Sequence, residues 1–391
     1  MEDIMFVYLD NSATTKPYAE VVTETIKYME DNFGNPSSLH RMGITAEKAI
    51  KTSRKSVAKS LGAYDEEIIF TSGGTESNNM ALFGVANARK RRGNRIITSK
   101  IEHPAILESC RRLEATGFQI EYIDVDSKGV VNLQALESAI DDKTILISIM
   151  EVNNEIGAVQ PIDEIISLKK KYEKQLGSEL IFHVDAVQSY GKLPFNLKNS
   201  DIDLMSISGH KIHGPKGIGA LYIRKGLSIE PYIYGGGQER SMRSGTENVP
   251  GIVGIGKATE MAFNNRIKRL ETMKIAKNYL LEGIKAEIKD FRINSQEVGI
   301  PSILNLSFSG IRGEVLLHTL EQYDIYVSTG SACSSNRKGQ SHVLKAMGLS
   351  DVEIQGAIRF SFSEFNTTTE MDYVLFNLKN TIDNMRKLNR K

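Results

Sequence analysis

Short apolar runs alternate with stretches of helical periodicity between about residues 65 and 225. Helix-like stretches at 75–92, 104–117 and 161–176 lie between most of these runs. Strands that alternate with helices predict an α/β fold with a mainly parallel, seven-stranded sheet sandwiched by helices. The seven predicted strands are Ile68–Phe70, Arg95–Thr98, Phe118–Ile123, Ile145–Met150, Leu180–Val184, Leu204–Ile207 and Ala220–Ile223.

The pattern differs on both sides of this block. Two helical stretches precede it, at about 18–33 and 44–61. After residue 250 we expect a long helix over 255–292, strands at 303–308, 325–328 and 357–362, and a terminal amphipathic helix at 368–388. We therefore expect a large α/β domain over 15–260. A smaller α+β domain would comprise 1–14 and 261–391, with a polar loop at about 328–341.

The composition is that of an ordinary globular protein. The 391 residues have a net charge of +1, so no general attraction to nucleic acid or acidic membranes is expected. No apolar run is long enough to span a membrane, and the acidic N-terminus does not resemble a signal peptide. Two cysteines are too few for a disulfide framework. These features predict a cytoplasmic protein with no direct nucleic-acid or membrane partner.

A glycine-containing turn follows the first predicted strand. The stretch from Thr71 to Asn79 contains Gly73 and Gly74 and leads into a helix. Glycines allow a close approach of the backbone, and the free N–H groups of a helix start favour an anion. The spacing matches no dinucleotide or nucleoside-triphosphate motif, so we predict a monophosphate site. The alternative is an ordinary glycine turn with a serine or threonine cap.

An acid and a lysine follow two other predicted strands. Asp185 ends a buried strand and needs a cationic or hydrogen-bonding partner. Lys211 follows the strand that ends at Ile207, and a lysine in such a place can lose its proton and bond to an aldehyde. Alone, Lys211 would be interpreted as a surface lysine. Together with a phosphate site and a buried carboxylate, it predicts a pyridoxal 5′-phosphate (PLP) site.

Further strand ends extend this site. His103 precedes a helix that starts at Pro104, so its ring can face the cofactor and exchange protons, although a capping or core histidine is the alternative. The stretch Val152–Gly157 supplies side-chain amides for the ring or a substrate carboxylate.

The two cysteines differ in setting. Cys333 lies in a small, polar, glycine-punctuated loop, where a thiol is better suited to act as a nucleophile than to fill a core. Cys110 belongs to an apolar helical stripe and is expected to be buried and inert.

These motifs resemble the cysteine desulfurases of the NifS/IscS type, within the class V aminotransferase group. The similar stretches run in order from residue 8 to residue 361, over nearly the whole chain. The resemblance implies the fold type I of PLP-dependent transferases and an obligate homodimer. The stretches are 8–15, 34–40, 71–78, 102–103, 152–157, 183–188, 208–211, 243–248, 330–333 and 359–361.

The resemblance also implies roles for individual residues. Lys211 would bind the cofactor covalently and later act as a general base, Asp185 would pair with the pyridine nitrogen, and His103 would stack on the ring. Gln188 would contact the ring hydroxyl, and Thr246 would reach the phosphate from the partner subunit. The implied cofactor-binding residues are Gly74, Thr75, His103, Asn154, Asp185, Gln188, Ser208, His210, Lys211 and Thr246.

On the substrate side, the resemblance implies L-cysteine as substrate. Asn154 and Arg359 would bind its carboxylate, with Asn11 or Ala13 nearby. The products would be L-alanine and a persulfide on Cys333, which an acceptor protein of iron–sulfur cluster assembly or of tRNA or cofactor thiolation would then take. No metal site is expected, although Cys333 could transiently ligate an iron–sulfur cluster.

Two positions depart from the family pattern, and several alternatives stay open. Glu151 stands where a histidine is common, and Val187 replaces a usual alanine. A selenocysteine lyase or an aminotransferase would use the same cofactor, but an aminotransferase does not need Cys333. A non-catalytic sulfur-transfer scaffold or regulator is disfavoured by the intact Lys211, His103 and Cys333. A nicotinamide dehydrogenase is disfavoured by the missing dinucleotide motif.

Overall fold

The central sheet forms from the apolar runs of the sequence. The computed structural model describes residues 4–296, 299–330 and 340–388. Its seven-stranded sheet has the order β2-β8-β7-β6-β5-β3-β4. In this sheet β8 runs antiparallel to both neighbours, and the other strands share one direction, so their carboxyl ends lie at one edge. All seven predicted strands are confirmed: β2 (Ile68–Thr71), β3 (Arg95–Ser99), β4 (Gln119–Ile123), β5 (Thr144–Met150), β6 (Ile181–Asp185), β7 (Leu204–Ser208) and β8 (Gly219–Ile223).

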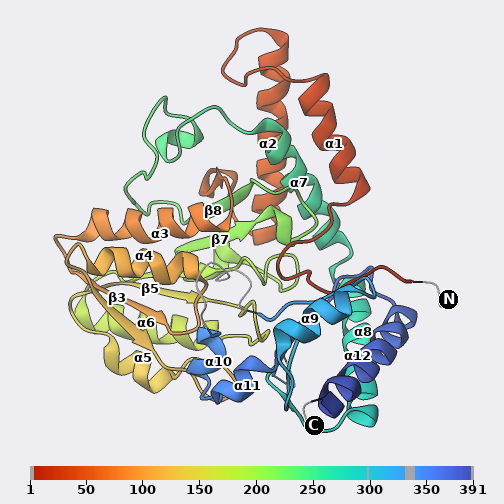
Figure 1. Ribbon diagram of the computed structural model, residues 1–391. Coiled ribbons are helices and arrows are strands. Elements are labelled where there is room, and N and C mark those ends of the chain that lie inside the picture. The colour runs from red at the N-terminus through yellow and green to blue at the C-terminus, as the bar shows by residue number, and fades with distance from the viewer. Residues whose placement is uncertain (1–3, 297–298, 331–339, 389–391) are drawn as a thin grey trace.

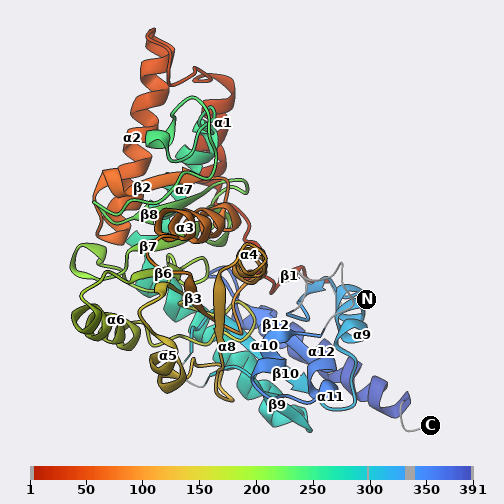
Figure 2. The same ribbon diagram turned by 90° about the vertical axis from the view of Figure 1, so that its left-hand side faces the viewer.

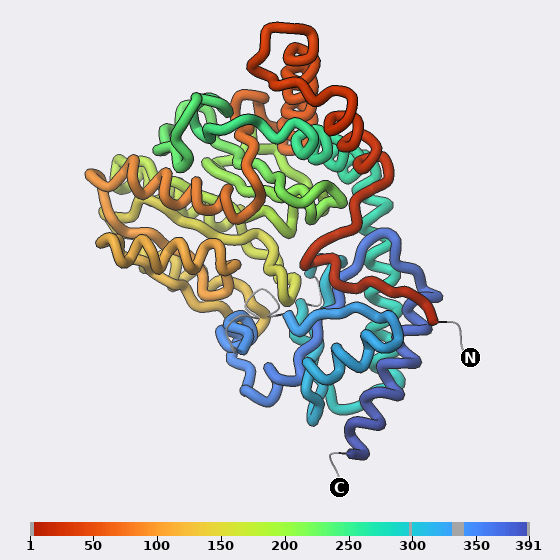
Figure 3. Tube along the Cα trace, turned by 45° about the horizontal axis from the view of Figure 1, so that its top comes forward, coloured from red at the N-terminus to blue at the C-terminus, as the bar shows by residue number. Residues whose placement is uncertain are grey.

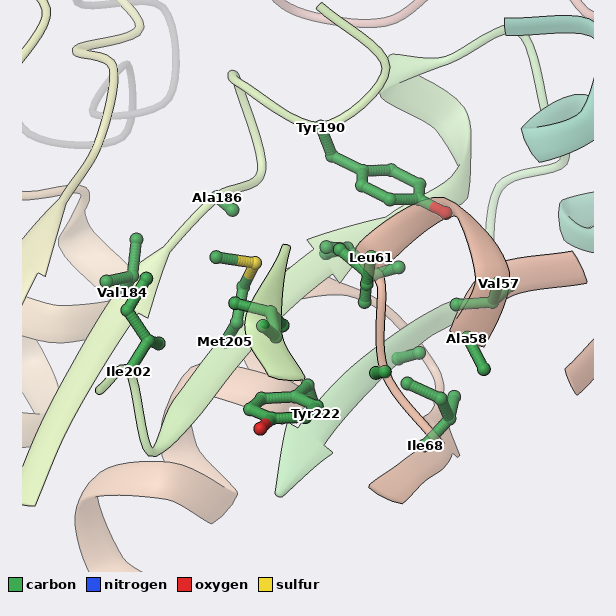
Figure 4. Close-up of a cluster of buried hydrophobic side chains, with 14 of the residues drawn as sticks. Val57, Ala58, Leu61, Ile68, Val184, Ala186, Tyr190, Ile202, Met205 and Tyr222 are labelled. Carbon is green, nitrogen blue, oxygen red and sulfur yellow. The ribbon is translucent and has the colours of Figure 1, made fainter. Parts of the chain in front are cut away.

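Helices cover both faces of this sheet (Figure 1). One face packs against α3 (Gly74–Arg89) and α4 (Pro104–Glu114). Figure 4 shows part of the core on the other face, where Leu61 and Tyr190 lie near Met205 and Tyr222 of the sheet. The Tyr190 hydroxyl is 2.7 Å from Ser60 Oγ, which satisfies a buried polar group at a helix of this layer. The helices on that face are α1 (Ala19–Glu30), α2 (Arg41–Leu61), α5 (Leu133–Ala139), α6 (Ile162–Leu176) and α7 (Val249–Asn264).

The C-terminal part packs around a second apolar cluster, which also includes Val7 and Leu9 from the N-terminal segment. Figures 2 and 3 show this blue and teal part together on one side of the molecule, with the red N-terminal segment running into it. The predicted domain boundaries at 14/15 and 260/261 stay a prediction. The elements are β1 (Val7–Tyr8) parallel to β11 (Ile325–Tyr326), the antiparallel sheet β12 (Ala357–Ser361), β10 (Ile303–Phe308) and β9 (Phe291–Ile293), and helices α8 (Arg266–Glu287), α9 (Gly313–Glu321), α10 (His342–Ala346), α11 (Asp351–Gln355) and α12 (Thr368–Leu388).

The single helix predicted over 255–292 is wrong at both ends. Helix α7 already begins at Val249, and α8 follows it after a break at Asn265, whose ψ of 16° is not helical. Beyond Ile288 the chain is extended, and Asp290 takes a φ of +53°. That turn lets β9 pair with the edge of β10, a tertiary contact that the mixed charges of the segment do not reveal. Within the described residues, no helix has the length and apolar character needed to cross a membrane.

Candidate active site

Five of the predicted site residues lie at or after the ends of five strands, at one edge of the sheet. The strands β2, β3, β5, β6 and β7 end there and lead to Gly74, His103, Asn154, Asp185 and Lys211. Their common edge follows from the shared strand direction. In open α/β sheets, ligands bind beyond the carboxyl ends of the strands. The predicted convergence of these residues is therefore present in the structure.

A cavity of about 370 Å³ lies at the start of α3. The first N–H groups of a helix lack intrahelical partners and favour an anion. Gly74 is the first residue of α3, and a Cβ there would lie 2.6 Å from Cγ2 of Val187, so a side chain at this position would force Val187 to move. The cavity is lined among others by four residues predicted to bind the cofactor, together with one that was not predicted: Gly74, Thr75, Ser208, His210 and Lys216.

The positive charge at this cavity comes from Lys216, which the sequence analysis missed. Burial lowers the pKa of His210 to about 4, and Lys211 and Lys216 shift this pKa in the same direction. The neutral His210 ring lies with Nδ1 3.2 Å from Thr14 Oγ1. Lys216 follows a Gly-Pro pair in the loop after β7 and lines the cavity. Its place in a turn after a strand end is the sequence signal that could have indicated it as a site residue.

Asp185 ends β6 with a side chain held by two hydrogen bonds. Asn78 donates to Oδ2 at 2.7 Å, and the Val187 N–H donates to Oδ1 at 3.0 Å. The residue is 4% exposed, so these donors offset part of the cost of burying a carboxylate. Asn78 was not predicted, because it lies 107 residues away in the sequence.

Lys211 follows β7 in a short 3₁₀ turn (Gly209–Lys211) and is half-buried. Its Nζ donates to the carbonyl oxygens of Ser12 and Ala13, the latter at 2.8 Å. Gln188 also donates to the Ser12 oxygen, at 3.0 Å. The N-terminal segment therefore lies against both predicted cofactor contacts. It positions the lysine amine at the edge of the sheet.

His103 precedes α4, where its Nδ1 accepts a hydrogen bond from the Ala105 N–H at 3.1 Å. Burial lowers the pKa of His103; Asp185 opposes this shift, and Lys211 and His342 add to it. The ring is thus neutral at neutral pH, with its proton on Nε2 because Nδ1 is an acceptor. To accept a further proton at Nδ1, His103 would have to release the Ala105 N–H.

Arg359 lies on β12 with a nearly buried side chain. Its Nη1 donates to the Asn154 carbonyl at 2.9 Å, and its Nη2 pairs with Asp10 at 2.6 Å. Its Nε has no hydrogen-bond partner within the described residues. Asn11 lies alongside, because its Nδ2 donates to the Ser361 carbonyl at 2.9 Å. The predicted substrate residues therefore meet at one place, and Asp10 is a partner of Arg359 that the sequence analysis missed.

Thr246 lies next to the phosphate cavity in its own chain. It lines a small cavity of about 160 Å³ together with Ser72 and Gly217, which also line the phosphate cavity. Its predicted contact across a dimer stays a prediction.

Of the two cysteines, only Cys110 lies within the described residues. Cys333 lies outside the described residues, whereas Cys110 is buried in α4 with 0% exposure, as predicted. Burial raises the pKa of the Cys110 thiol far above its usual range, and Glu102 and Glu114 add to this shift. Cys110 is therefore unsuited to act as a nucleophile.

Comparison with known families assigns the chain. The family model described as aminotransferase class-V matches residues 7–374. The chain belongs to this family. A cysteine desulfurase IscS from Methanosarcina thermophila is 46% identical over 382 residues, covering 98% of this chain and 93% of the relative. The IscS relative from Dictyoglomus turgidum is 45% identical over 383 residues, covering 98% and 96%.

Solved structures of class-V relatives show the same fold. A NifS-like protein superposes with a TM-score of 0.91 at 43% identity, covering 97% of this chain and 100% of the relative. A structure described as SspA in complex with cysteine has a TM-score of 0.81 at 36% identity, covering 92% and 100%. The predicted fold and the predicted resemblance to NifS/IscS proteins are confirmed. As a member of this family, the chain is a PLP-dependent protein.

The residues at the sheet edge fit PLP. The helix start and Lys216 suit a phosphate, and the hydrogen-bonded carboxylate of Asp185 suits a protonated pyridine nitrogen. Within the described residues, Gln188 Oε1 and Asn78 Oδ1 are buried without a hydrogen-bond partner, as expected where a polar ligand completes the site. Lys211 supplies the amine for the aldehyde.

Proposed function

We propose that this protein is a cysteine desulfurase that converts L-cysteine to L-alanine and transfers the sulfur to Cys333. One observation carries the proposal. Gly330 and Ser341, which lie on either side of the Cys333 segment, both contact Glu155, the neighbour of Asn154. The described chain on both sides of the Cys333 segment is therefore held beside the carboxylate-binding residues. An aminotransferase has no use for a cysteine there.

Each residue of the site would have its own role in the reaction. PLP, when bound, withdraws electrons from the substrate and so favours cleavage of its carbon–sulfur bond. Lys211 binds the cofactor and moves protons at the substrate carbon, and Asp185 accepts the hydrogen bond of the pyridine nitrogen. Arg359 orients the substrate carboxylate through its planar guanidinium.

The sulfur step uses Cys333 as nucleophile. Its thiolate attacks the sulfur of the bound cysteine, so a sulfur–sulfur bond forms while the carbon–sulfur bond breaks. The carbon keeps the electron pair of the broken bond and takes up a proton, which gives alanine. The enzyme thiol and L-cysteine are thereby converted to an enzyme persulfide and L-alanine without any outside oxidant. We further propose that an acceptor protein removes this sulfur, in iron–sulfur cluster assembly or in thiolation.

The reaction can be tested with the PLP-loaded protein, L-cysteine and a thiol reductant that releases the persulfide as sulfide. We expect alanine and sulfide in equal amounts, measured by amino-acid analysis and a sulfide assay. Formation of a keto acid without sulfide would instead indicate an aminotransferase and would contradict the proposal.

Arg359→Lys is expected to raise KM for L-cysteine by roughly tenfold or more, because a lysine cannot make the paired hydrogen bonds of the guanidinium. PLP absorbance should be unchanged. Cysteamine lacks the carboxylate and serves as the control ligand: the variant should bind it as the wild type does. An unchanged KM for L-cysteine would contradict the assignment of Arg359.

We also propose the homodimer that the resemblance implies; the cytoplasmic location stays a prediction. Helices α1 and α2 project from the body of the molecule (Figure 1). Large apolar side chains are exposed on α1 and in the connection between α1 and α2, a pattern typical of a surface that a partner covers. They include Met29 (63% exposed), Phe33 (69%) and Leu39 (95%).

Phe33→Asp combined with Leu39→Asp is expected to shift the protein from dimer to monomer, since two charges would be buried without partners. Light scattering after size-exclusion chromatography measures the mass. Ile267→Asp is the matched control, because Ile267 on α8 is also 79% exposed. If the double variant stays dimeric while Ile267→Asp becomes monomeric, the interface lies elsewhere.

A further inference from the structure

One buried carboxylate lies between the residues that flank the Cys333 segment (331–339). The Ser341 hydroxyl donates to Glu155 Oε2 at 2.5 Å. Gly330 packs against the same oxygen so closely that a Cβ at Gly330 would lie 3.1 Å from it. Gly330 also has a φ of +82°, which a side chain would disfavour. The chain before the segment and the chain after it therefore meet at a single atom.

The chain before the segment is tied to the substrate side of the site. Ser328 and Arg359 exchange two backbone hydrogen bonds, at 3.1 and 2.6 Å. The Arg359 side chain in turn donates to the Asn154 carbonyl at 2.9 Å, and Asn154 precedes Glu155. Glu155 is therefore linked to Arg359, the proposed substrate-binding residue, through a single intervening residue, Asn154. A shift of Glu155 would change the position of this arginine.

The chain after the segment is equally fixed. Ser341 Oγ accepts a hydrogen bond from the Leu344 N–H at 3.1 Å and so caps α10. Val343 and Leu344 are buried in an apolar cluster with Ile101 and Met150, which extend from β3 and β5. Ser341 thus links the carboxylate to a helix that is packed against the main sheet.

We propose that Glu155 is a positioning residue that fixes both flanks of the Cys333 segment beside the substrate site. The inference rests on the proposed function, because it concerns delivery of the Cys333 thiol to the substrate sulfur. Cys333 is three positions after Gly330 in the sequence, so the chain between their Cα atoms spans at most about 11 Å. The place where Gly330 is held therefore limits where the thiol can act.

The protonation of Glu155 supports this role. Burial raises the pKa of Glu155 to about 7, and the Ser341 hydrogen bond and the charge of Arg359 oppose this rise. Ser341 and Arg359 face the carboxyl group from α10 and β12, and the Asn305 amide of β10 donates to its backbone carbonyl. Because the folded pKa exceeds the usual value of 4.5, the stability that the neutral form provides is present at low pH and is lost as pH rises through about 7.

The contact is tested by Ser341→Ala in the PLP-loaded protein, with the rate of Cys333 persulfide formation measured by quenched-flow mass spectrometry. We expect this rate to fall by about tenfold or more, because the change removes a hydrogen bond from a buried carboxyl group and leaves that group without this partner. The PLP absorbance change on addition of L-cysteine should be unaffected. Ser350→Ala is the matched control: Ser350 caps the equally short α11 and bonds Glu353, but does not touch Glu155. Equal rates for the two variants would overturn the inference.

The pH dependence gives a readout that a merely structural role would not produce. Glu155→Gln keeps a hydrogen-bond partner for Ser341 but cannot ionise. We expect the ratio of the wild-type rate to the Glu155→Gln rate to fall by about threefold or more as pH rises through about 7, since thiolate formation at Cys333 cancels in this ratio. A constant ratio would contradict the role of Glu155. A wild-type protein that forms alanine but no persulfide would overturn the proposed function, and this inference with it.

Discussion

Lys211→Ala is expected to yield a protein that no longer binds PLP covalently and that loses turnover of L-cysteine by on the order of 10³-fold, the scale of losing a positioned general base. The amine of Lys211 lies against the Ser12 and Ala13 carbonyls, at the edge where Asp185 and the phosphate cavity also lie. Absorbance spectroscopy measures the covalent cofactor, and borohydride reduction followed by peptide mapping locates it.

Lys192 provides the control for this prediction. It is buried, and burial lowers its pKa to about 7, with Arg269 and Lys211 acting in the same direction. Its amine is therefore available in the neutral form, but Nζ donates to the Gln188 carbonyl at 2.8 Å rather than to the N-terminal segment. Lys192→Met should retain the yellow colour of the bound cofactor. A borohydride-trapped cofactor on Lys192 would contradict the assignment of Lys211.

Cys333→Ala is expected to lower alanine formation by at least about 10³-fold while PLP stays bound, because only the sulfur-accepting nucleophile is removed. The contacts proposed for the cofactor come from the edge of the main sheet. Amino-acid analysis measures alanine, and the cofactor spectrum reports binding.

The second cysteine is the matched control. Cys110→Ala should keep nearly all activity and lose about 1 kcal/mol of stability, as expected for a small group removed from a core. If Cys333→Ala still released sulfide at the wild-type rate, sulfur transfer through this residue would be contradicted.

The sequence predicted the main sheet well, because buried parallel strands form apolar runs with few interruptions. It also placed Lys211, Asp185 and His103 at one edge, since parallel strands share a direction. In contrast, β9 was assigned to a helix. This strand has three residues at a sheet edge and is defined by its pairing with β10 rather than by its own pattern.

The site partners that were missed are defined by contacts between distant parts of the chain. Asp10 meets Arg359 across 349 residues, and Asn78 meets Asp185 across 107. Glu155 meets Ser341 across 186 residues. Residue type and local spacing give no information on such pairs, because they depend on how α3, the N-terminal segment and the C-terminal part pack against the sheet. Lys216 is the exception, since it follows β7 closely.

The most direct test of the account is to find the sulfur. The PLP-loaded protein would be mixed with L-cysteine without reductant, and its two cysteine peptides compared by mass spectrometry. The account predicts one added sulfur atom on the Cys333 peptide, an unmodified Cys110 peptide and one alanine for each persulfide. Alanine without added sulfur on Cys333, or sulfur found on Cys110, would contradict it.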